Sequence, residues 1–392
     1  MPHAMAQAVE IVTTVLAVAG MGYFLAAMVA ARVFLHERRR PRAEFAPGVT
    51  ILKSLKGLDP GMLDAFRSHC RQNYAGEFEM LFGVGSLDDP AAAAVKELQA
   101  EFPQRTIRLL ECPERLGTNG KVSTLAQLAE HAQHDFLLIN DSDITVGPHY
   151  LERVMCCFAP ASDHAGKPPV GLVTALYRGK AHNTLPSRLE ALGIAAEFMP
   201  GVLLSKLIEG GLHYGLGSTL TVRREALEKA GGLLSIVDYL ADDYELGVRV
   251  SRAGYRVDVS AEVVETAVPA YSWRGFFDHQ LRWLRTVRTA RPGGYAGLIF
   301  THGFGWAIVK VLASGLSPAS LWLLALSFFL RLAQAMTVGA WVLADHEVLA
   351  NLWLLPLRDV IAMALWVAGF AGDTIVWRGE RFSLKDGKLA KV

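Results

Sequence analysis

The sequence of 392 residues is poor in cysteine and has no excess of charge of either sign. Its four cysteines lack the C-x-x-C spacing of cysteine-based metal sites, and they are too few for a disulfide scaffold. The 39 lysines and arginines balance 38 acidic residues, whereas nucleic-acid-binding proteins normally carry a basic excess. The 36 glycines and 17 prolines are ordinary amounts, which excludes collagen-like and disordered repeats. We therefore expect reduced, packed thiols and no nucleic-acid partner.

Apolar residues, by contrast, make up 52% of the chain and form long runs near both ends. Residues 9–35 are almost continuously apolar, and a membrane-spanning helix needs about 20 such residues. Four arginines follow within residues 38–42, which reverses the order of a signal peptide, where basic residues precede the apolar run. We therefore predict a retained transmembrane anchor with its C-terminal side in the cytosol. The alternative is a buried core helix, and the length and the flanking arginines argue against it.

Three more apolar blocks lie near the C-terminus, at residues 297–316, 319–344 and 348–372. Each contains charge, which is unfavourable at membrane depth unless it is paired, snorkels or faces a cavity. These charged residues are Lys310, Arg331, Arg358 and Asp359. The tail, residues 378–392, is basic and favours a cytosolic C-terminus, but three full spans would place it outside. One block is therefore expected to be interfacial or re-entrant.

Between about residue 44 and residue 266, short apolar runs alternate with helix-like stretches. This alternation predicts an α/β domain with a mostly parallel sheet. Ligands of such sheets bind beyond the carboxyl ends of the strands, so acidic residues at these ends are candidate site residues. Strands are predicted at 49–53, 78–84, 106–110 and 136–139, and helices at 62–72, 90–100 and 122–131.

Asp141 and Asp143 follow directly on the fully apolar strand at 136–139. Because side chains alternate along an extended chain, the two carboxylates can point the same way at the strand end. Paired carboxylates suit a hard divalent cation, Mg²⁺ or Mn²⁺, which would neutralise a departing nucleotide diphosphate. Capping of the turn before the helical stretch 148–158 is the alternative interpretation, and both stay open here.

Asp88 and Asp89 lie between the second predicted strand and the helix that begins at Pro90. At this edge of the sheet either carboxylate can hydrogen-bond a base or a ribose. Capping of the following helix explains the pair about as well.

Asp242 and Asp243 lie downstream of a glycine-rich stretch, residues 210–219, which indicates backbone close to a ligand. An acidic residue beside such a stretch can be the general base that removes the proton of an attacking hydroxyl. The same acids also favour the N-terminus of a helix, predicted at 243–252, through the helix dipole. The two roles are compatible, and spacing alone does not assign the site.

The segment 276–285 is basic and aromatic, and Arg288 and Arg291 continue its basic face. Its arginines can clamp a diphosphate through bidentate guanidinium contacts. The alternative is an interfacial helix with arginines at the lipid headgroups and Trp283 in the aromatic belt.

The order of these segments resembles the ceramide glucosyltransferase family of membrane-bound GT-A glycosyltransferases, and the similar glycosyltransferases of hopanoid biosynthesis. The resemblance runs from the anchor to the C-terminal blocks. It implies the inverting transfer of one hexose, glucose or N-acetylglucosamine, from a UDP-sugar to a membrane lipid at the cytosolic face. The acceptor would be a hydroxyl of a ceramide or other sphingolipid, or of a hopanoid. The stretches that carry the resemblance are 51–60 (ILKSLKGLDP), 88–91 (DDPA), 141–143 (DSD), 231–233 (GGL), 241–244 (ADDY) and 282–283 (RW).

The resemblance also implies roles for the acidic residues. Asp89 is the expected nucleotide-side carboxylate, with Asp88 beside it. Asp141 and Asp143 are the expected ligands of the divalent cation, and Asp243 is the expected catalytic base.

A second set of expected nucleotide-sugar contacts is basic or aromatic. Arg282 and Trp283 match the family motif (Q/R)xxRW, but the first position is His279, which departs from the pattern. Lys53 and Lys121 are further candidates to face the nucleotide.

On this interpretation the protein is an integral membrane protein, in the cell inner membrane if bacterial, with an α/β GT-A domain in the cytosol. One N-terminal and two to three C-terminal membrane helices are expected. The expected parts are an anchor with its basic flank (1–42), the GT-A domain (43–266), an interfacial segment with the RW motif (267–296), membrane helices (297–377) and a basic tail (378–392). The alternatives are a processive polysaccharide synthase, which needs more spans for a pore, and a transporter or scaffold.

Overall fold

The computed structural model describes residues 2–160, 166–377 and 380–391, and the chain divides into two compact units. We call the first the α/β unit; it comprises Arg38–Lys180, Glu209–Pro269 and Gly387–Val392. The second, the helical unit, comprises Met1–Glu37, Ala181–Ile208 and Ala270–Asp386. The two units interleave along the chain, so neither is one continuous segment.

The α/β unit is built on an eight-stranded sheet with the order β3-β2-β1-β4-β7-β6-β8-β5. The four strands predicted from the sequence, β1 to β4, are adjacent and parallel, as expected. The other half of the sheet is mixed, because β7 runs antiparallel to both β4 and β6. The strands are β1 (Val49–Ser54), β2 (Phe78–Val84), β3 (Thr106–Glu111), β4 (Phe136–Ile139), β5 (Ile144–Thr145), β6 (Val170–Lys180), β7 (Leu220–Arg223) and β8 (Arg256–Ala267).

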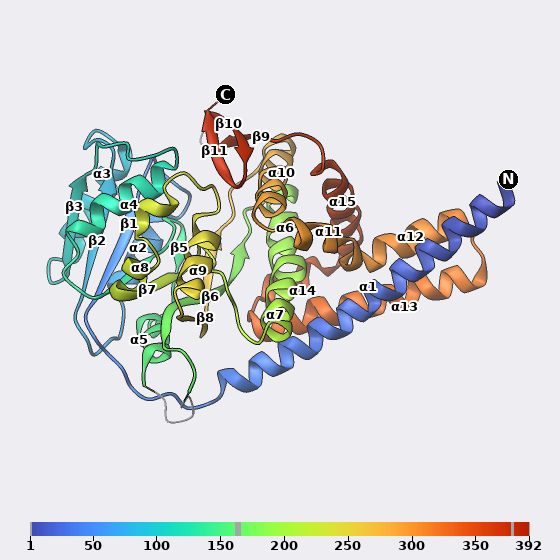
Figure 1. Cartoon of the computed structure of the whole chain (residues 1–392), viewed down its shortest axis with the longest axis horizontal. Helices are drawn as coiled ribbons and strands as arrows, with labels where there is room; N and C mark the ends of the chain where they lie inside the picture. The colour runs from blue at the N-terminus through green and yellow to red at the C-terminus, as the bar shows by residue number, and fades with distance from the viewer. Residues whose placement is uncertain (1, 161–165, 378–379, 392) are drawn as a thin grey trace. The chain divides into compact units, whose positions relative to one another are not determined.

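Helices α2, α3 and α4 connect the parallel strands (Figure 1). Helix α3 packs with β2 and β3, α4 packs with β1 and β2, and α2 packs with α3 and β5. Asp89 is the N-cap of α3 and Asn119 is the N-cap of α4; each side chain accepts a hydrogen bond from a free backbone N–H. The helical elements of this unit are α2 (Met62–Cys70), α3 (Pro90–Glu101), α4 (Gly120–Glu130), α5 (Tyr150–Met155), η1 (Cys156–Phe158), α8 (Arg224–Lys229), η4 (Leu233–Ile236) and α9 (Asp242–Arg252).

The helical unit contains four helices that are long and apolar enough to cross a membrane within the described residues. They cover Met5–Arg38, Leu185–Ile208, Pro318–Val342 and His346–Ala368. A further helix pair, Pro292–Thr301 with Gly303–Ala313, is bent by 56°. The elements of the helical unit are α1 (Pro2–Arg38), α6 (Leu185–Gly193), η3 (Ile194–Phe198), α7 (Met199–Ile208), α10 (Trp273–Ala290), α11 (Pro292–Gly297), η5 (Leu298–Thr301), α12 (Gly303–Ala313), α13 (Pro318–Ala335), η6 (Met336–Val342), α14 (His346–Asn351), η7 (Leu352–Leu354), α15 (Leu355–Ala368), β9 (Thr374–Trp377) and β10 (Glu380–Lys385).

The charges within the apolar blocks are paired, which is one of the three arrangements that the sequence leaves open. Lys310 on α12 lies 2.8 Å from Glu10 on α1, which joins the N-terminal anchor to the first C-terminal block. Gly20 and Gly303 allow α1 and α12 to approach closely, because a Cβ at Gly20 would lie 2.1 Å from Gly303 Cα (Figure 1).

The other three charged residues of these blocks are also in ion pairs. Arg331 binds Asp359, with Nη2 to Oδ1 at 2.7 Å, and both side chains are buried. Arg358 lies 2.8 Å from Glu197, which belongs to η3. These pairs compensate the unfavourable burial of charge at membrane depth.

The helix Leu185–Ile208 was not predicted as an apolar membrane-type segment from the sequence. On the sequence alone, it is included in the GT-A domain, residues 43–266, because short apolar runs alternate with helix-like stretches over that region. The structure assigns it to the helical unit, where the Ala196 carbonyl accepts a 2.7 Å hydrogen bond from Arg331 Nη1. The residue four positions further along is Pro200, which has no N–H to donate to this carbonyl in a regular helical bond.

The basic tail returns to the α/β unit. β11 (Lys388–Lys391) pairs Lys388 with Tyr239, and the Leu389 N–H donates to the Asp238 carbonyl at 2.8 Å. Of the tail residues, Arg378 lies outside the described residues. The four cysteines are free thiols, three of them buried, as expected.

Candidate active site

The D-x-D residues lie at the carboxyl end of β4, between β1 and β7 in the sheet. The Asp141 carboxylate is accessible, with 45% of its side chain exposed. The Asp143 carboxylate is half-buried, and Oδ2 accepts a short hydrogen bond from the Thr266 hydroxyl at the end of β8. The two carboxylates therefore have different surroundings, although they are two residues apart.

A buried polar network supports this loop from below. Lys53, at the end of β1, is fully buried, and Nζ donates to Asn140 Oδ1 at 2.7 Å and to the Asp141 carbonyl at 3.0 Å. The Asn140 amide in turn lies 3.1 Å from His69 Nε2 and donates to Tyr150 Oη at 3.3 Å. Such a network satisfies buried polar groups and fixes the backbone that carries the exposed carboxylate.

Burial changes the ionisation of two members of this network, Lys53 and His69. Burial lowers the pKa of Lys53 to about 7, although Asp143 and Asp141 oppose the shift. Burial and the neighbouring Lys53 also keep the pKa of His69 well below its usual value. A neutral His69 ring with its proton on Nδ1, facing the Ala65 carbonyl at 2.8 Å, presents Nε2 as the acceptor for Asn140.

Lys121 connects the D-x-D loop to the second acidic pair. It lies in the first turn of α4, and Nζ is 2.8 Å from Asp141 Oδ1 and 3.2 Å from Asp242 Oδ2. These two carboxylates are 101 residues apart in the sequence, so the lysine marks the point where the two motifs converge. The two carboxylates raise the pKa of Lys121 despite its burial, so its ammonium is charged at neutral pH.

Asp243 points at the same region from the first turn of α9. Its Oδ2 accepts a 2.8 Å hydrogen bond from the Gly217 N–H, and Oδ1 accepts one from its neighbour Tyr244. A Cβ at Gly217 would lie 3.2 Å from Asp243 Oδ2 and 3.5 Å from Asp141 Oδ2. The carboxylates that the family resemblance assigns to base and cation therefore approach the same glycine.

The pKa values of Asp143 and Asp243, whose side chains are half-buried, are raised above the usual range. Burial, reinforced by Asp242, raises the pKa of Asp243 to about 6. Burial, reinforced by Asp141, raises the pKa of Asp143 to about 6 as well. A carboxylate whose pKa approaches neutrality is better matched to proton transfer at pH 7 than an exposed one.

The glycine-rich stretch serves packing as well as the site. A Cβ at Gly247 on α9 would lie 2.2 Å from Gly215 N, so α9 contacts this loop backbone to backbone. Gly210 has φ +71°, which favours glycine. Of Gly210, Gly215 and Gly217, only Gly217 lies beside the carboxylates of Asp141 and Asp243. The other two glycines therefore serve backbone conformation and packing, and do not indicate a ligand.

The nucleotide-side candidates Asp88 and Asp89 differ in structure. Asp89 caps α3 through Ala91 N at 2.9 Å, and its two oxygens lie 3.0 and 3.1 Å from the Gly57 N–H. Asp88 is exposed. Capping of α3 by Asp89 is therefore observed, and the nucleotide contact of this pair stays a prediction.

The RW motif lies on α10, in the helical unit. His279 Nδ1 is 3.3 Å from Glu190 Oε1, and its ring stacks on Tyr271 with centroids 5.3 Å apart. Trp283 packs on Phe198 with ring centroids 5.4 Å apart. Gln280, the residue after His279, donates a hydrogen bond from Nε2 to Glu190 Oε2 at 2.7 Å. His279 and Gln280 therefore contact the same carboxylate.

The basic face of α10 has a structural role that sequence analysis did not foresee. Arg288 donates to the carbonyls of Gly369 and Phe370 at 2.8 and 2.7 Å, and Arg285 donates to the Ala371 carbonyl at 2.8 Å. These carbonyls follow the end of α15 and have no partner within that helix. The two arginines therefore cap the C-terminus of α15. The expected contact of Arg282 with the nucleotide sugar stays a prediction.

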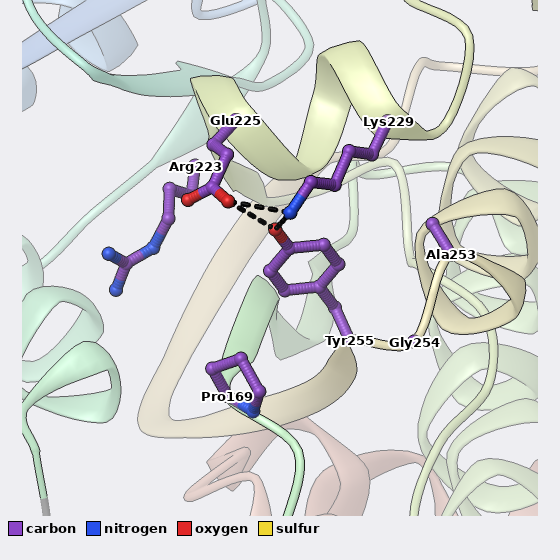
Figure 2. Close-up of a pocket in the computed structure, with 7 residues that line it drawn as sticks. All are labelled: Pro169, Arg223, Glu225, Lys229, Ala253, Gly254 and Tyr255. Atoms are coloured by element: carbon purple, nitrogen blue, oxygen red, sulfur yellow. Dashed lines mark hydrogen bonds and ion pairs between the residues drawn. The ribbon is translucent and has the colours of Figure 1, made fainter.

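A surface pocket of about 270 Å³ lies elsewhere on the α/β unit (Figure 2). Lys229 donates to Glu225 at 2.7 Å and to the Tyr255 hydroxyl at 3.0 Å, so these polar groups satisfy one another. Arg223, which lines the same pocket, pairs in the sheet with Phe136 at the start of β4. The pocket is thus at the opposite end of β4 from the D-x-D loop and is not the active site.

Sequence reasoning missed the roles of Asn140, His69 and Tyr150 below the loop, whereas Gly217 belongs to the glycine-rich stretch 210–219 that it singled out. One signal was available for His69. It occupies a position on the stripe of α2 that also contains Met62, Ala65, Phe66 and Cys70, and all five are buried. A polar residue on an apolar stripe indicates a specific partner in the core.

The model of glycosyl transferase family 21 matches residues 12–390, which is nearly the whole chain. The chain belongs to this family. It is therefore a glycosyltransferase, and the expectation of an enzyme of the ceramide glucosyltransferase type is confirmed. This family 21 chain is 23% identical to ceramide glucosyltransferase 3 of Caenorhabditis elegans over 96% of its length and 82% of the relative. It is 22% identical to ceramide glucosyltransferase 1 of the same organism over 90% of its length and 75% of the relative.

A solved structure has the same fold. A mannosyltransferase from Pyrobaculum calidifontis, in complex with GDP-Man and Mn²⁺, superimposes with a TM-score of 0.55 at 20% identity. The match covers 92% of this chain and 97% of the other. Together with the mixed α/β sheet and the apolar helices, it confirms the GT-A fold of a membrane protein.

Proposed function

We propose that this family 21 enzyme transfers one hexose from a UDP-sugar to a hydroxyl of a membrane lipid, with inversion at the anomeric carbon. The observation that carries the proposal is that Asp243 Oδ2 and Asp141 Oδ2 both lie within 3.5 Å of the position that a Cβ on Gly217 would take, which supports a base next to a diphosphate site. Ceramide and other sphingolipids, or hopanoid polyols, are the proposed acceptors. Glucose and N-acetylglucosamine are the proposed sugars.

Asp243 is the proposed catalytic base. It would take the proton of the lipid hydroxyl while the hydroxyl oxygen attacks the anomeric carbon and the bond to UDP breaks. Hydrogen bonds from Gly217 and Tyr244 hold the carboxylate in one orientation. One displacement of this kind inverts the anomeric centre.

Asp141 and Asp143 are the proposed ligands of a divalent cation, Mg²⁺ or Mn²⁺. Within the described residues, no three His, Cys, Asp or Glu side chains gather as a metal site. Two carboxylates nevertheless fit these ions, which bind through one or two carboxylates, water and substrate phosphates. The Lys121 ammonium between Asp141 and Asp242 supports the fit, because it shows that this cluster accommodates positive charge. When bound, the cation would neutralise charge on the departing diphosphate.

Contacts to the nucleotide sugar are proposed for Asp89, Asp88, His279, Arg282 and Trp283. Lys53 and Lys121 are proposed to act on the donor side as well. Lys53 would do so through the loop, because its Nζ binds Asn140 and the Asp141 backbone.

We further propose that the α/β unit faces the cytosol, in the inner membrane if the source is bacterial. The C-terminal residues rejoin the α/β unit, so an even number of spans must separate residues 270 and 386. Crossings by Pro318–Val342 and His346–Ala368 satisfy this count if the bent pair before them is re-entrant. The segment Leu185–Ile208 leaves and rejoins the same unit, so it would lie at the interface instead of crossing.

The test is a transfer assay with the purified full-length enzyme, UDP-glucose or UDP-N-acetylglucosamine, and ceramide or hopanoid acceptors, with Mn²⁺ or Mg²⁺ present. Mass spectrometry should show one added hexose, and NMR should show the inverted anomeric configuration. A polymeric product would instead indicate a processive synthase, and retention of configuration would contradict the role of Asp243.

A further inference from the structure

Lys121 occupies the centre of the acidic cluster that the proposed function assigns to cation and base. Its side chain is 21% exposed, and Nζ lies 2.8 Å from Asp141 Oδ1 and 3.2 Å from Asp242 Oδ2. The backbone that carries it is fixed, because the neighbouring N-cap Asn119 donates to the Tyr239 carbonyl at 2.8 Å. The hydrogen bond of Asn119 therefore fixes the start of α4, and the contacts with Asp141 and Asp242 fix the Lys121 ammonium.

The cluster contains more negative charge than this one ammonium balances. Asp141, Asp143, Asp242 and Asp243 all belong to it, and the pKa values of Asp143 and Asp243 are raised partly by their acidic neighbours. Lys121 lowers this mutual repulsion while the site is empty.

A divalent cation bound to Asp141 would come within a few ångströms of that ammonium. Mg²⁺ binds carboxylate oxygens at about 2.0–2.1 Å, while Lys121 Nζ lies 2.8 Å from Asp141 Oδ1. At such separations, charges of the same sign repel strongly even at an effective dielectric constant of about 20. The other oxygen, Oδ2, is bonded to the same carboxyl carbon, so a cation bound to it would also lie close to the ammonium.

We infer that Lys121 and the divalent cation compete for Asp141, so that cation binding displaces the lysine from the carboxylate. This inference rests on the proposed function, because it takes the cation of that reaction as the competitor. Lys121 then acts as a positioning residue: it holds the acidic cluster together without cation and is released when the cation binds.

Direct measurement of Mn²⁺ binding tests this inference without any transfer reaction. Free Mn²⁺ is followed by electron paramagnetic resonance during titration of the full-length enzyme without nucleotide. Lys121→Met should bind Mn²⁺ at least about tenfold more tightly than the unchanged protein, because the competing charge is gone. Lys121→Arg keeps the charge and should keep the weaker affinity. Lys229→Met, which removes a lysine paired with Glu225 at the opposite end of β4, is the matched control and should leave Mn²⁺ affinity unchanged.

Equal or weaker Mn²⁺ binding by Lys121→Met overturns the inference but leaves the proposed function intact. No Mn²⁺ binding by either protein, even with UDP added, overturns the proposed cation and the inference with it. If Lys121→Met does not fold, amine labelling of the unchanged enzyme gives the answer by mass spectrometry. Mn²⁺ should raise the labelling of Lys121 relative to that of Lys229, and an unchanged ratio overturns the competition.

Discussion

Replacement of Asp243 by asparagine is the most direct test of the proposed chemistry. The carboxylate accepts two backbone hydrogen bonds, from Gly217 N–H to Oδ2 and from Tyr244 N–H to Oδ1, both at 2.8 Å. An asparagine side chain has one acceptor oxygen, so its amide group must face one of these N–H donors. The structural penalty is about one hydrogen bond, about 1–2 kcal/mol, which is small beside the stability of a domain. The variant should therefore fold.

The effect on transfer should be far larger. Loss of a positioned general base lowers a rate about 10²- to 10⁴-fold, equivalent to about 3–5 kcal/mol in the activation free energy. UDP-sugar binding should be nearly unchanged, because the base acts on the acceptor hydroxyl. Single-turnover transfer from a saturating UDP-sugar measures the first effect, and calorimetric titration with UDP measures the second.

Asp242→Asn is the matched control, since it makes the same chemical change one residue earlier on α9. The Asp242 carboxylate contacts Lys121, whereas Asp243 Oδ2 lies beside Asp141 Oδ2 at Gly217. Asp242→Asn should therefore keep most of the transfer rate. Near-normal turnover by Asp243→Asn, or equal inactivation of both variants, would refute the assignment of the base.

Three further predictions follow from the same geometry. Gly217→Ala would place a Cβ 3.2 Å from Asp243 Oδ2 and should lower kcat/KM about tenfold, whereas Gly120→Ala, whose Cβ meets nothing within 4 Å, should leave it unchanged. Because the pKa of Asp243 is raised to about 6 and only the ionised form accepts a proton, kcat/KM should fall as pH drops below about 6 and level off above about 7; a profile flat down to pH 5 would contradict this. In the helical unit, Asp359→Leu leaves Arg331 buried without its carboxylate and should lower the free energy of unfolding in detergent by about 3–5 kcal/mol, and combining it with Arg331→Met should recover most of that loss.

Much of the α/β unit could be read from local sequence alone. The four strands from β1 to β4 and the helices between them were predicted within a few residues, because their apolar periodicity and capping residues are local signals. Asp89 shows this well: its position before Pro90 indicated an N-cap, and the structure has it there. The second half of the sheet was not predicted, because β6, β7 and β8 pair over long sequence separations in mixed directions.

The same limit applies to the helical unit. A charge such as Lys310 at membrane depth is favourable only if it is paired, snorkels or faces a cavity, and nothing in the local sequence pointed to Glu10, 300 residues earlier, as its partner. The apolar helix Leu185–Ile208 falls within the predicted GT-A domain, residues 43–266, because short apolar runs alternate with helix-like stretches over that region.

For the site, the sequence by itself determined which residue types were available: acidic pairs at strand and helix ends, and glycines that permit close approach. Only the tertiary structure decided that Asp141 and Asp243 both approach Gly217 and that Lys121 contacts both Asp141 and Asp242. The physical reason is that strand and helix signals act over a few residues. The distance between two carboxylates about a hundred residues apart depends instead on how β4, α4 and α9 pack around one sheet.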